Sequence, residues 1–299
     1  MRLQTMDRRS FLQTGLCAAA TATLCPFGTS ANAEYKKYEK RIPIGLELYS
    51  LRDVINHETF PKYLKWVAET GFEFVEFAGY HGYDGKELRK LLDDVGLKAS
   101  STHIGFDQIK GDNLKKSAEF ANEVGFKFLI VPGGLEGRIR ESLDSNKKVA
   151  EEMSECAEEA GKLGVFVGFH GHTGDYQNIN GTETSAWITF FNNCDPRVIA
   201  QVDVGWCDHA HTHGQKLTAE ETLRALPGRG RILHIKSNNT AVKGCVVGDS
   251  DDHVDWQSVF EAAHDVAGTE FFCVEQEQFK VSSCDSAREC IENLKKLGW

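Results

Sequence analysis

The chain has 299 residues, of which 44 are acidic and 34 basic, so its formal net charge is −10. This excess of negative charge argues against a nucleic-acid-binding protein, because the phosphates of the nucleic acid would be repelled. After the first 33 residues no apolar run approaches the roughly 20 residues that a membrane-spanning helix needs, so no membrane association is expected.

The first 33 residues have the order of an export signal. Arg8 and Arg9 precede a mildly apolar stretch, and Ala31, Asn32 and Ala33 form a small-x-small cleavage site. This order predicts a twin-arginine signal peptide at residues 1–33 and a periplasmic bacterial protein. Residues 34–299 are then expected to form a single domain, close to the length of roughly 250 residues that is typical of a (β/α)8 barrel.

Short apolar runs alternate with helical patterns along the whole of residues 34–299. The eight runs are residues 44–49, 72–77, 97–103, 126–131, 165–170, 198–204, 231–236 and 271–275. Between them, residues 85–96, 146–164 and 254–268 have apolar side chains at helical spacing. Eight strands that alternate with helices predict an α/β fold, a (β/α)8 TIM barrel with a parallel sheet.

Polar side chains follow seven of the eight runs. In a parallel barrel the carboxyl ends of the strands carry the functional residues, and buried charges there are costly unless they are paired or bound to a metal. The residues at these ends are Glu47, Tyr49, Glu76, His103, His170, His172, Asp203, Trp206, His234, Lys236, Glu275 and Glu277.

Asp203, His234, Glu275 and one residue of run five together offer oxygen and nitrogen donors from four runs. Each residue alone is explained equally well as a hydrogen-bonded core residue. As a set they predict a site for one divalent cation, Mn²⁺, Co²⁺ or Zn²⁺, with Mg²⁺ as a further option.

Several segments resemble one known family. They read "IGLELYSLRD", "GFEFVEFAGYHG", "GLKASSTHIG", "VDVGWCDHA", "RILHIKSN" and "VEQEQF". They are similar to the xylose isomerase-like TIM barrel proteins, also called sugar phosphate isomerases/epimerases. The resemblance implies metal ligands at Asp203, His234 and Glu275, and it implies His170 as the fourth ligand. At that position the family usually has Glu-Asn-His, whereas this chain has His170, Gly171 and His172.

The resemblance implies a sugar isomerase or epimerase that removes a proton next to a carbonyl and forms an enediolate. The candidate general bases are Glu275, His103 and His172, and Lys236 is a further catalytic candidate that orients hydroxyl groups. Glu76 and Glu277 are expected to bind substrate hydroxyls, and Tyr49 and Trp206 to stack on a sugar ring. Because the chain has an export signal and lacks a phosphate-binding glycine loop, we expect an unphosphorylated sugar or glycoside derivative.

Three alternatives stay open at this stage. The same enediolate would serve a lyase or dehydratase acting on a keto-sugar or keto-glycoside. The missing glutamate at His170 is also consistent with a non-catalytic periplasmic sugar-binding barrel. A metal-dependent endonuclease of abasic DNA is disfavoured by the acidic charge. The oligomeric state is open between a monomer and a homo-oligomer.

Overall fold

The computed structural model describes residues 41–239 and 242–298. The predicted signal peptide at residues 1–33 lies outside the described residues. All of the described residues belong to one compact unit. No helix among them is both long enough and apolar enough to cross a membrane.

The described residues form eight strands, and each lies within one of the predicted apolar runs. The strands are β1 (Ile44–Glu47), β2 (Phe74–Phe77), β3 (Lys98–His103), β4 (Phe128–Val131), β5 (Phe166–His170), β6 (Ile199–Gln201), β7 (Ile232–Ile235) and β8 (Phe271–Val274). They pair in parallel in the order β6-β5-β4-β3-β2-β1-β8-β7. The predicted eight-stranded parallel sheet is confirmed.

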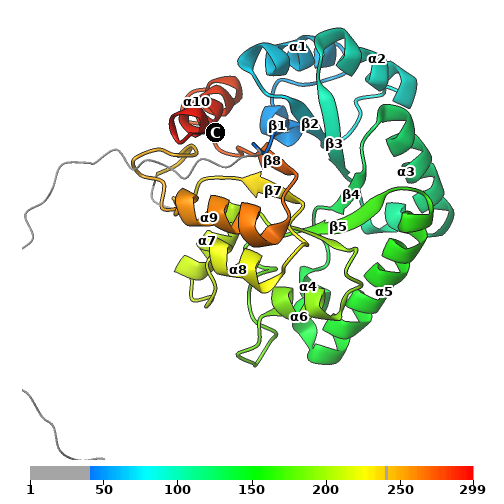
Figure 1. Ribbon diagram of the computed structural model, residues 1–299, viewed down its shortest axis with the longest axis vertical. Helices are drawn as coiled ribbons and strands as arrows, with labels where there is room; N and C mark the ends of the chain where they lie inside the picture. The colour runs from blue at the N-terminus through cyan, green and yellow to red at the C-terminus, as the bar shows by residue number, and fades with distance from the viewer. Residues whose placement is uncertain (1–40, 240–241, 299) are drawn as a thin grey trace, which may run out of the picture. The chain divides into compact units, whose positions relative to one another are not determined.

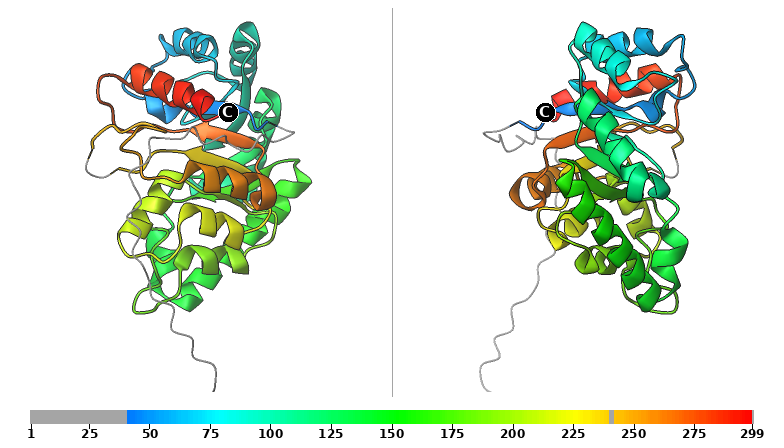
Figure 2. Two further views of the ribbon diagram at one scale, coloured as in Figure 1. Left: turned by 60° about the vertical axis from the view of Figure 1, so that its left-hand side comes forward. Right: turned by 90° about the vertical axis from the view of Figure 1, so that its right-hand side faces the viewer.

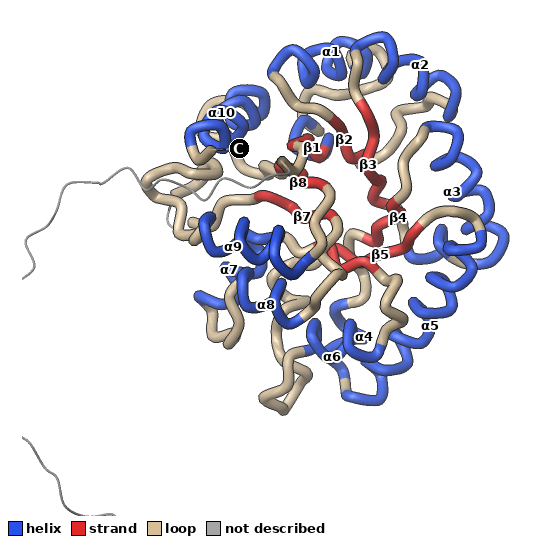
Figure 3. Tube along the Cα trace, in the orientation of Figure 1, coloured by secondary structure: helices blue, strands red, loops and turns tan. Residues whose placement is uncertain are grey.

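Helical segments follow every strand and surround the sheet (Figures 1 and 3). The α-helices are α1 (Phe60–Thr70), α2 (Gly85–Val95), α3 (Gly111–Val124), α4 (Glu136–Glu141), α5 (Leu143–Lys162), α6 (Ala186–Asn193), α7 (Val204–Thr212), α8 (Ala219–Ala225), α9 (Trp256–Ala262) and α10 (Ser283–Lys296). Two short 3₁₀ segments, Leu48–Leu51 and Phe106–Ile109, and a π-helical turn, Ala263–Ala267, complete the described helical structure. The long helix α5 packs beside β5 on the outside of the barrel (Figure 2).

Local sequence explains where the helices begin and end. Asp84 and Glu87 form a capping box at the start of α2, and Gly96, the last residue of the predicted helical pattern, ends this helix in the left-handed conformation at φ 76°. The predicted helix at 254–268 divides into α9 and the π-helical turn. Asp255 begins α9 by accepting a hydrogen bond from the Ser258 backbone.

The sheet closes into a barrel between β6 and β7. The His234 backbone N donates to the Val202 carbonyl at 3.0 Å, and Ala200 N donates to the Arg229 carbonyl at 3.0 Å. Asp203 and His234 pair as an isolated parallel bridge across this seam. Ring closure therefore places two predicted metal ligands next to each other.

Side chains inside the barrel follow the two-residue period of the strands. Phe74, Phe128, Ile130, Ile199, Ile232 and Cys273 form a small apolar cluster that is separate from the main core between sheet and helices. Gly45 makes room for this cluster, because a Cβ there would lie 2.3 Å from the Phe74 ring. Glu76 and His234 each lie two residues beyond a member of the cluster, so apolar packing gives way to a polar layer.

Candidate active site

The polar layer at the carboxyl ends of the strands is almost completely removed from solvent. Glu47, Glu76, Gln201, Asp203 and His234 are fully buried, and His170 and Glu275 are 1% and 4% exposed. Burying this many ionisable groups is costly unless they neutralise each other or bind an ion. The layer is therefore the part of the described structure whose composition is hardest to explain by stability alone.

His234 lies between two glutamates. Its Nδ1 is 2.8 Å from Glu275 Oε2, and its Nε2 is 2.5 Å from Glu76 Oε2. Burial disfavours the charged imidazole, but these carboxylates hold the pKa of His234 well above its ordinary value. A cation that took a nitrogen of His234 would have to displace one proton, since a metal-bound imidazole is neutral.

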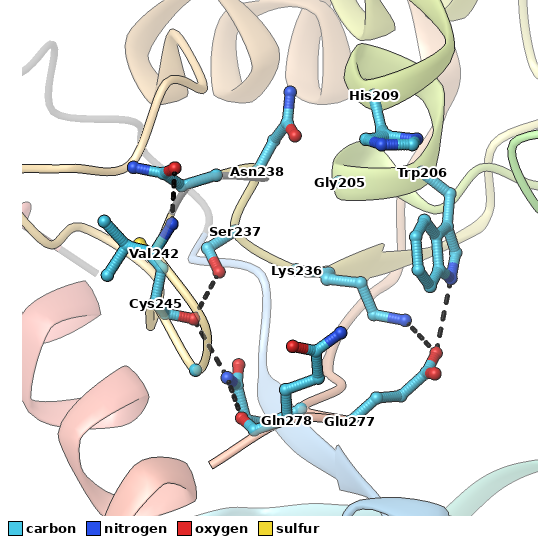
Figure 4. Close-up of a pocket in the computed structure, with 13 residues that line it drawn as sticks. Gly205, Trp206, His209, Lys236, Ser237, Asn238, Val242, Cys245, Glu277 and Gln278 are labelled. Atoms are coloured by element: carbon cyan, nitrogen blue, oxygen red, sulfur yellow. Dashed lines mark hydrogen bonds and ion pairs between the residues drawn. The ribbon is translucent and has the colours of Figure 1, made fainter. Parts of the chain in front are cut away.

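Lys236 neutralises the carboxylates on the other side of the layer. Its Nζ lies 3.2 Å from Asp203 Oδ2 and 3.1 Å from Glu275 Oε2, and it also pairs with Glu277. The ammonium sits over the Trp206 ring at 4.6 Å from the centroid. Burial opposes the charge, yet the three carboxylates raise the pKa of Lys236 above its ordinary range. Lys236 is therefore charged. Figure 4 shows the ion pair of Lys236 with Glu277 and the hydrogen bond of Trp206 to the same carboxylate.

The two carboxylate oxygens of Asp203 have different roles: one caps a helix, and the other is available to the site. Its Oδ1 accepts a hydrogen bond from Trp206 N at 2.8 Å and thereby caps helix α7. Its Oδ2 is buried and makes no hydrogen bond, but it forms ion pairs with Lys236 Nζ and, at 3.9 Å, with His234 Nδ1. Burial raises the pKa of Asp203 to about 7, although Lys236 opposes the rise. A buried carboxylate oxygen without a hydrogen-bond donor is well suited to a cation.

Gln201 is a site residue that the sequence analysis missed. Its Oε1 lies 2.8 Å from His103 Nε2 and 3.0 Å from His170 Nδ1, so both imidazoles donate to it, and its Nε2 donates to Glu76 Oε1 at 2.8 Å. With Nδ1 protonated, His170 keeps its Nε2 lone pair for a ligand, as in histidines held by a neighbour in metal sites. A polar residue in the otherwise apolar strand β6, two positions before Asp203, was the available signal.

The four predicted ligands come together. Single donor atoms of His170, Asp203, His234 and Glu275 all lie within 4.8 Å of one another, and all four residues are buried. Burial, followed by the charge of His234, lowers the pKa of His170 well below its ordinary value, so this imidazole is neutral. Two imidazoles and two carboxylates suit Mn²⁺, Co²⁺ or Zn²⁺. The residues therefore fit a divalent cation, which would share Asp203 and Glu275 with the Lys236 ammonium.

A cavity of about 340 Å³, which we call the central pocket, reaches the donor group at His170 and Glu275. Its lining residues are Tyr49, Ala78, His103, Pro132, His170, His172, Glu275 and Glu277. The His172 side chain is 45% exposed there, and its ring lies 4.8 Å from that of His170 between centroids. Burial and the nearby Lys236 lower the pKa of His172. His172 is therefore a neutral, accessible base above the donor group.

The remaining predicted residues lie in three different places. Tyr49 is 44% exposed at the rim, and Arg52 holds it next to the last strand by donating to the carbonyls of Tyr49 and Glu277. Glu76 has no exposed surface and is occupied by His234 and Gln201, so it supports the site from below. Trp206, Lys236 and Glu277 line a second cavity of about 260 Å³ next to the central pocket.

Comparisons with known proteins agree with this architecture. The family model described as "Xylose isomerase-like TIM barrel" matches residues 64–297. No curated protein sequence matches the chain significantly.

Three solved structures illustrate the similarity. A sugar phosphate isomerase/epimerase from Parabacteroides distasonis has a TM-score of 0.69 at 22% identity, covering 89% of this chain and 98% of the other. A D-allulose 3-epimerase from Methylomonas sp. has a TM-score of 0.65 at 16% identity, covering 88% and 100%. A 3-keto-D-glucoside 4-epimerase from E. coli has a TM-score of 0.59 at 17% identity, covering 86% and 99%. At such identities these similarities concern the fold.

Proposed function

Because this chain belongs to the xylose isomerase-like TIM barrel family, we propose that it is a metal-dependent enzyme that moves a proton next to a carbonyl group of an unphosphorylated carbohydrate. The observation that carries the proposal is the buried donor group His170, Asp203, His234 and Glu275, two members of which, His170 and Glu275, line the central pocket. The sugar epimerases of similar fold support the substrate class. The features of residues 1–33 support a periplasmic location.

His170, Asp203, His234 and Glu275 would hold the cation. A divalent cation at this position supplies a Lewis acid that polarises a carbonyl and stabilises negative charge developing on the substrate oxygens. Gln201 keeps His170 in the tautomer that offers Nε2, and Trp206 N keeps Asp203 oriented through Oδ1. The protein thereby pre-orients its donors before substrate arrives.

His172 is the best-placed group for accepting the proton. It lines the central pocket, it is partly exposed, and its lowered pKa keeps the imidazole neutral near pH 7. Glu275 also lines this pocket, but its Oε2 is occupied by His234 and Lys236. We therefore assign proton abstraction to His172. Glu275 is assigned to the polar layer beneath the pocket, where it would hold the cation. Return of the proton to the carbon gives isomerisation or epimerisation.

A lyase or dehydratase is the second candidate, and the pair of Lys236 and Glu277 favours it. Glu277 lines the central pocket, and both residues line a second cavity that could take a departing group. After the proton is removed next to the carbonyl, the bond from the β-carbon to its oxygen would break. The leaving oxygen would then take a proton from this pair. One active site would thus support either outcome, depending on the substrate.

Metal content and hydrogen exchange test the proposal together. The purified protein should bind one divalent cation per chain, and keto-sugars incubated with it in D₂O should gain deuterium at the carbon next to the carbonyl. His172→Gln should lower the exchange rate about 100-fold or more, while its cation affinity stays within about twofold of the unaltered protein. Asp203→Asn, which keeps an oxygen for the helix cap, should lose the cation.

The outcomes separate the alternatives. A protein that binds no divalent cation contradicts the metal-dependent reaction. Cation and sugar binding without exchange across the panel would instead support the non-catalytic sugar-binding barrel. Full exchange by His172→Gln would show that another residue takes the proton.

A further inference from the structure

Proton transfer in the central pocket does not need the second cavity, so this cavity calls for a separate explanation. This side pocket of about 260 Å³ lies beyond the carboxyl ends of β6, β7 and β8 (Figure 4). Its lining includes Trp206, Ser237, Val242, Gln276 and Gln278. Its size is near the lower end of the roughly 300–1,000 Å³ that is usual for small-molecule pockets.

The side pocket adjoins the central pocket at a single residue. Glu277 lines both cavities, and its carboxylate is held by Lys236 and by Trp206 Nε1 at 3.3 Å. A substrate that occupied both pockets would therefore cross over Glu277. The bond that joins its two halves would then lie beside the Lys236–Glu277 pair.

The floor of the side pocket is polar and firmly held. The Cys245 carbonyl accepts hydrogen bonds from Ser237 Oγ at 2.7 Å and from Gln276 Nε2 at 2.9 Å. Gln276 Nε2 also donates to the Gln278 carbonyl at 2.7 Å, and Gln276 is 3% exposed. Asn238 is 5% exposed, and its Nδ2 has no hydrogen-bond partner. These groups fix the shape of the floor, and the exposed amide of Gln278 together with the Trp206 ring gives the side pocket a lining that suits a ring with hydroxyl groups.

The electrostatics of the side pocket disfavour an anion. Lys236 is the only lysine or arginine among the described residues that line it, and its charge is already balanced by Asp203, Glu275 and Glu277. His209 adds no charge, because burial and the nearby His213 lower its pKa. A phosphate group in the side pocket would meet the Glu277 carboxylate and an ammonium that three carboxylates already share, so a neutral group is favoured.

From these observations we infer that the side pocket is a subsite for a neutral, hydroxyl-rich ring, and that the substrate is a disaccharide or a comparable glycoside. The ring that carries the reacting carbonyl lies in the central pocket, and the second ring lies against Trp206 and the amides of the side pocket. The inference rests on the proposed function, because it assigns the reacting ring to the central pocket.

Calorimetric titration of the cation-loaded protein tests the subsite. The ligands are methyl glucoside, cellobiose, maltose, trehalose and glucose 6-phosphate. At least one disaccharide should bind about tenfold more tightly than methyl glucoside. Two additional hydrogen bonds of typical net strength, formed by the second ring in the side pocket, are enough for a gain of this size. Glucose 6-phosphate should not bind more tightly than methyl glucoside.

Two variants that fill the side pocket provide the specificity control. Val242→Trp and Gln278→Trp each add bulk at the side pocket, away from the donor group. Each should abolish the disaccharide advantage and leave methyl glucoside within about twofold of the unaltered protein. The matched variant Ala78→Phe adds bulk to the central pocket and should weaken both kinds of ligand.

The failures are distinguishable. If methyl glucoside binds and no disaccharide gains, or if the gain survives both tryptophan variants, the subsite is wrong and the proposed function stands. If no sugar binds the cation-loaded protein, the subsite is wrong, and the proposed function fails as well only if keto-sugars show no hydrogen exchange in D₂O.

Discussion

Replacement of Gln201 by methionine is the most direct test of how the donor group is organised. The side chain of Gln201 makes three contacts that methionine cannot make, with His103 Nε2 at 2.8 Å, His170 Nδ1 at 3.0 Å and Glu76 Oε1 at 2.8 Å. Without Gln201, His170 is free to turn or to change tautomer. Loss of such a supporting contact typically costs 10- to 100-fold in metal affinity, so a loss of about this size is expected.

The same replacement should also lower stability, which makes a control necessary. Each buried group left unpaired costs about 1–3 kcal/mol, so urea unfolding should show a loss of several kcal/mol. Gln276→Met is the matched variant, because Gln276 is also buried and its side-chain amide donates to the Cys245 and Gln278 carbonyls, not to any of the four donors. Gln276→Met should lose stability and keep its cation affinity.

Calorimetric titration with Mn²⁺, Co²⁺ and Zn²⁺ on folded protein gives the answer. If Gln201→Met binds these cations as tightly as Gln276→Met, Gln201 does not orient His170 for the cation. A loss of affinity in both variants would point to general destabilisation instead of a change in the orientation of His170.

Three further predictions concern charge in and around the site. Lys236→Met should raise cation affinity about tenfold or more in titration, because it removes a positive charge next to Asp203 and Glu275. Unchanged affinity would mean that the Lys236 ammonium does not compete with the cation for these carboxylates. Asp203→Asn should abolish measurable cation binding, yet circular dichroism should show intact helix content, because its side-chain oxygen still caps α7. Asp175 is 2% exposed, and burial raises its pKa to about 7 from an ordinary value near 3.8. The folded state thus holds a proton that the unfolded state releases, so stability should fall by up to about 4 kcal/mol as pH rises from 4 to 7. Asp175→Asn should flatten that part of the urea-unfolding profile relative to the unaltered protein, and an identical slope would contradict the assignment.

Much of the fold could be predicted from the sequence, because its signals are local. Apolar runs with a glycine or a polar cap at their boundaries determine where strands and helices form, and all eight predicted strands are present in the described residues. The (β/α)8 barrel follows from their alternation with helices. Three donor residues, Asp203, His234 and Glu275, could be predicted from their places at strand ends, where buried charge is costly, whereas His170 was implied by the family resemblance.

Other parts of the site depend on distances across the barrel, which no local pattern encodes. Closure between β6 and β7 pairs Asp203 with His234. Only the curvature of the complete ring brings Gln201 within reach of His103 and Glu76, and turns Glu76 into a buried partner of His234. The sequence by itself thus determined the elements and the types of donor, because these follow from the strand period and from residue chemistry. The tertiary structure decided which donors face each other, how Lys236 neutralises them, and that a second pocket lies beyond Glu277, because these depend on how distant strands meet.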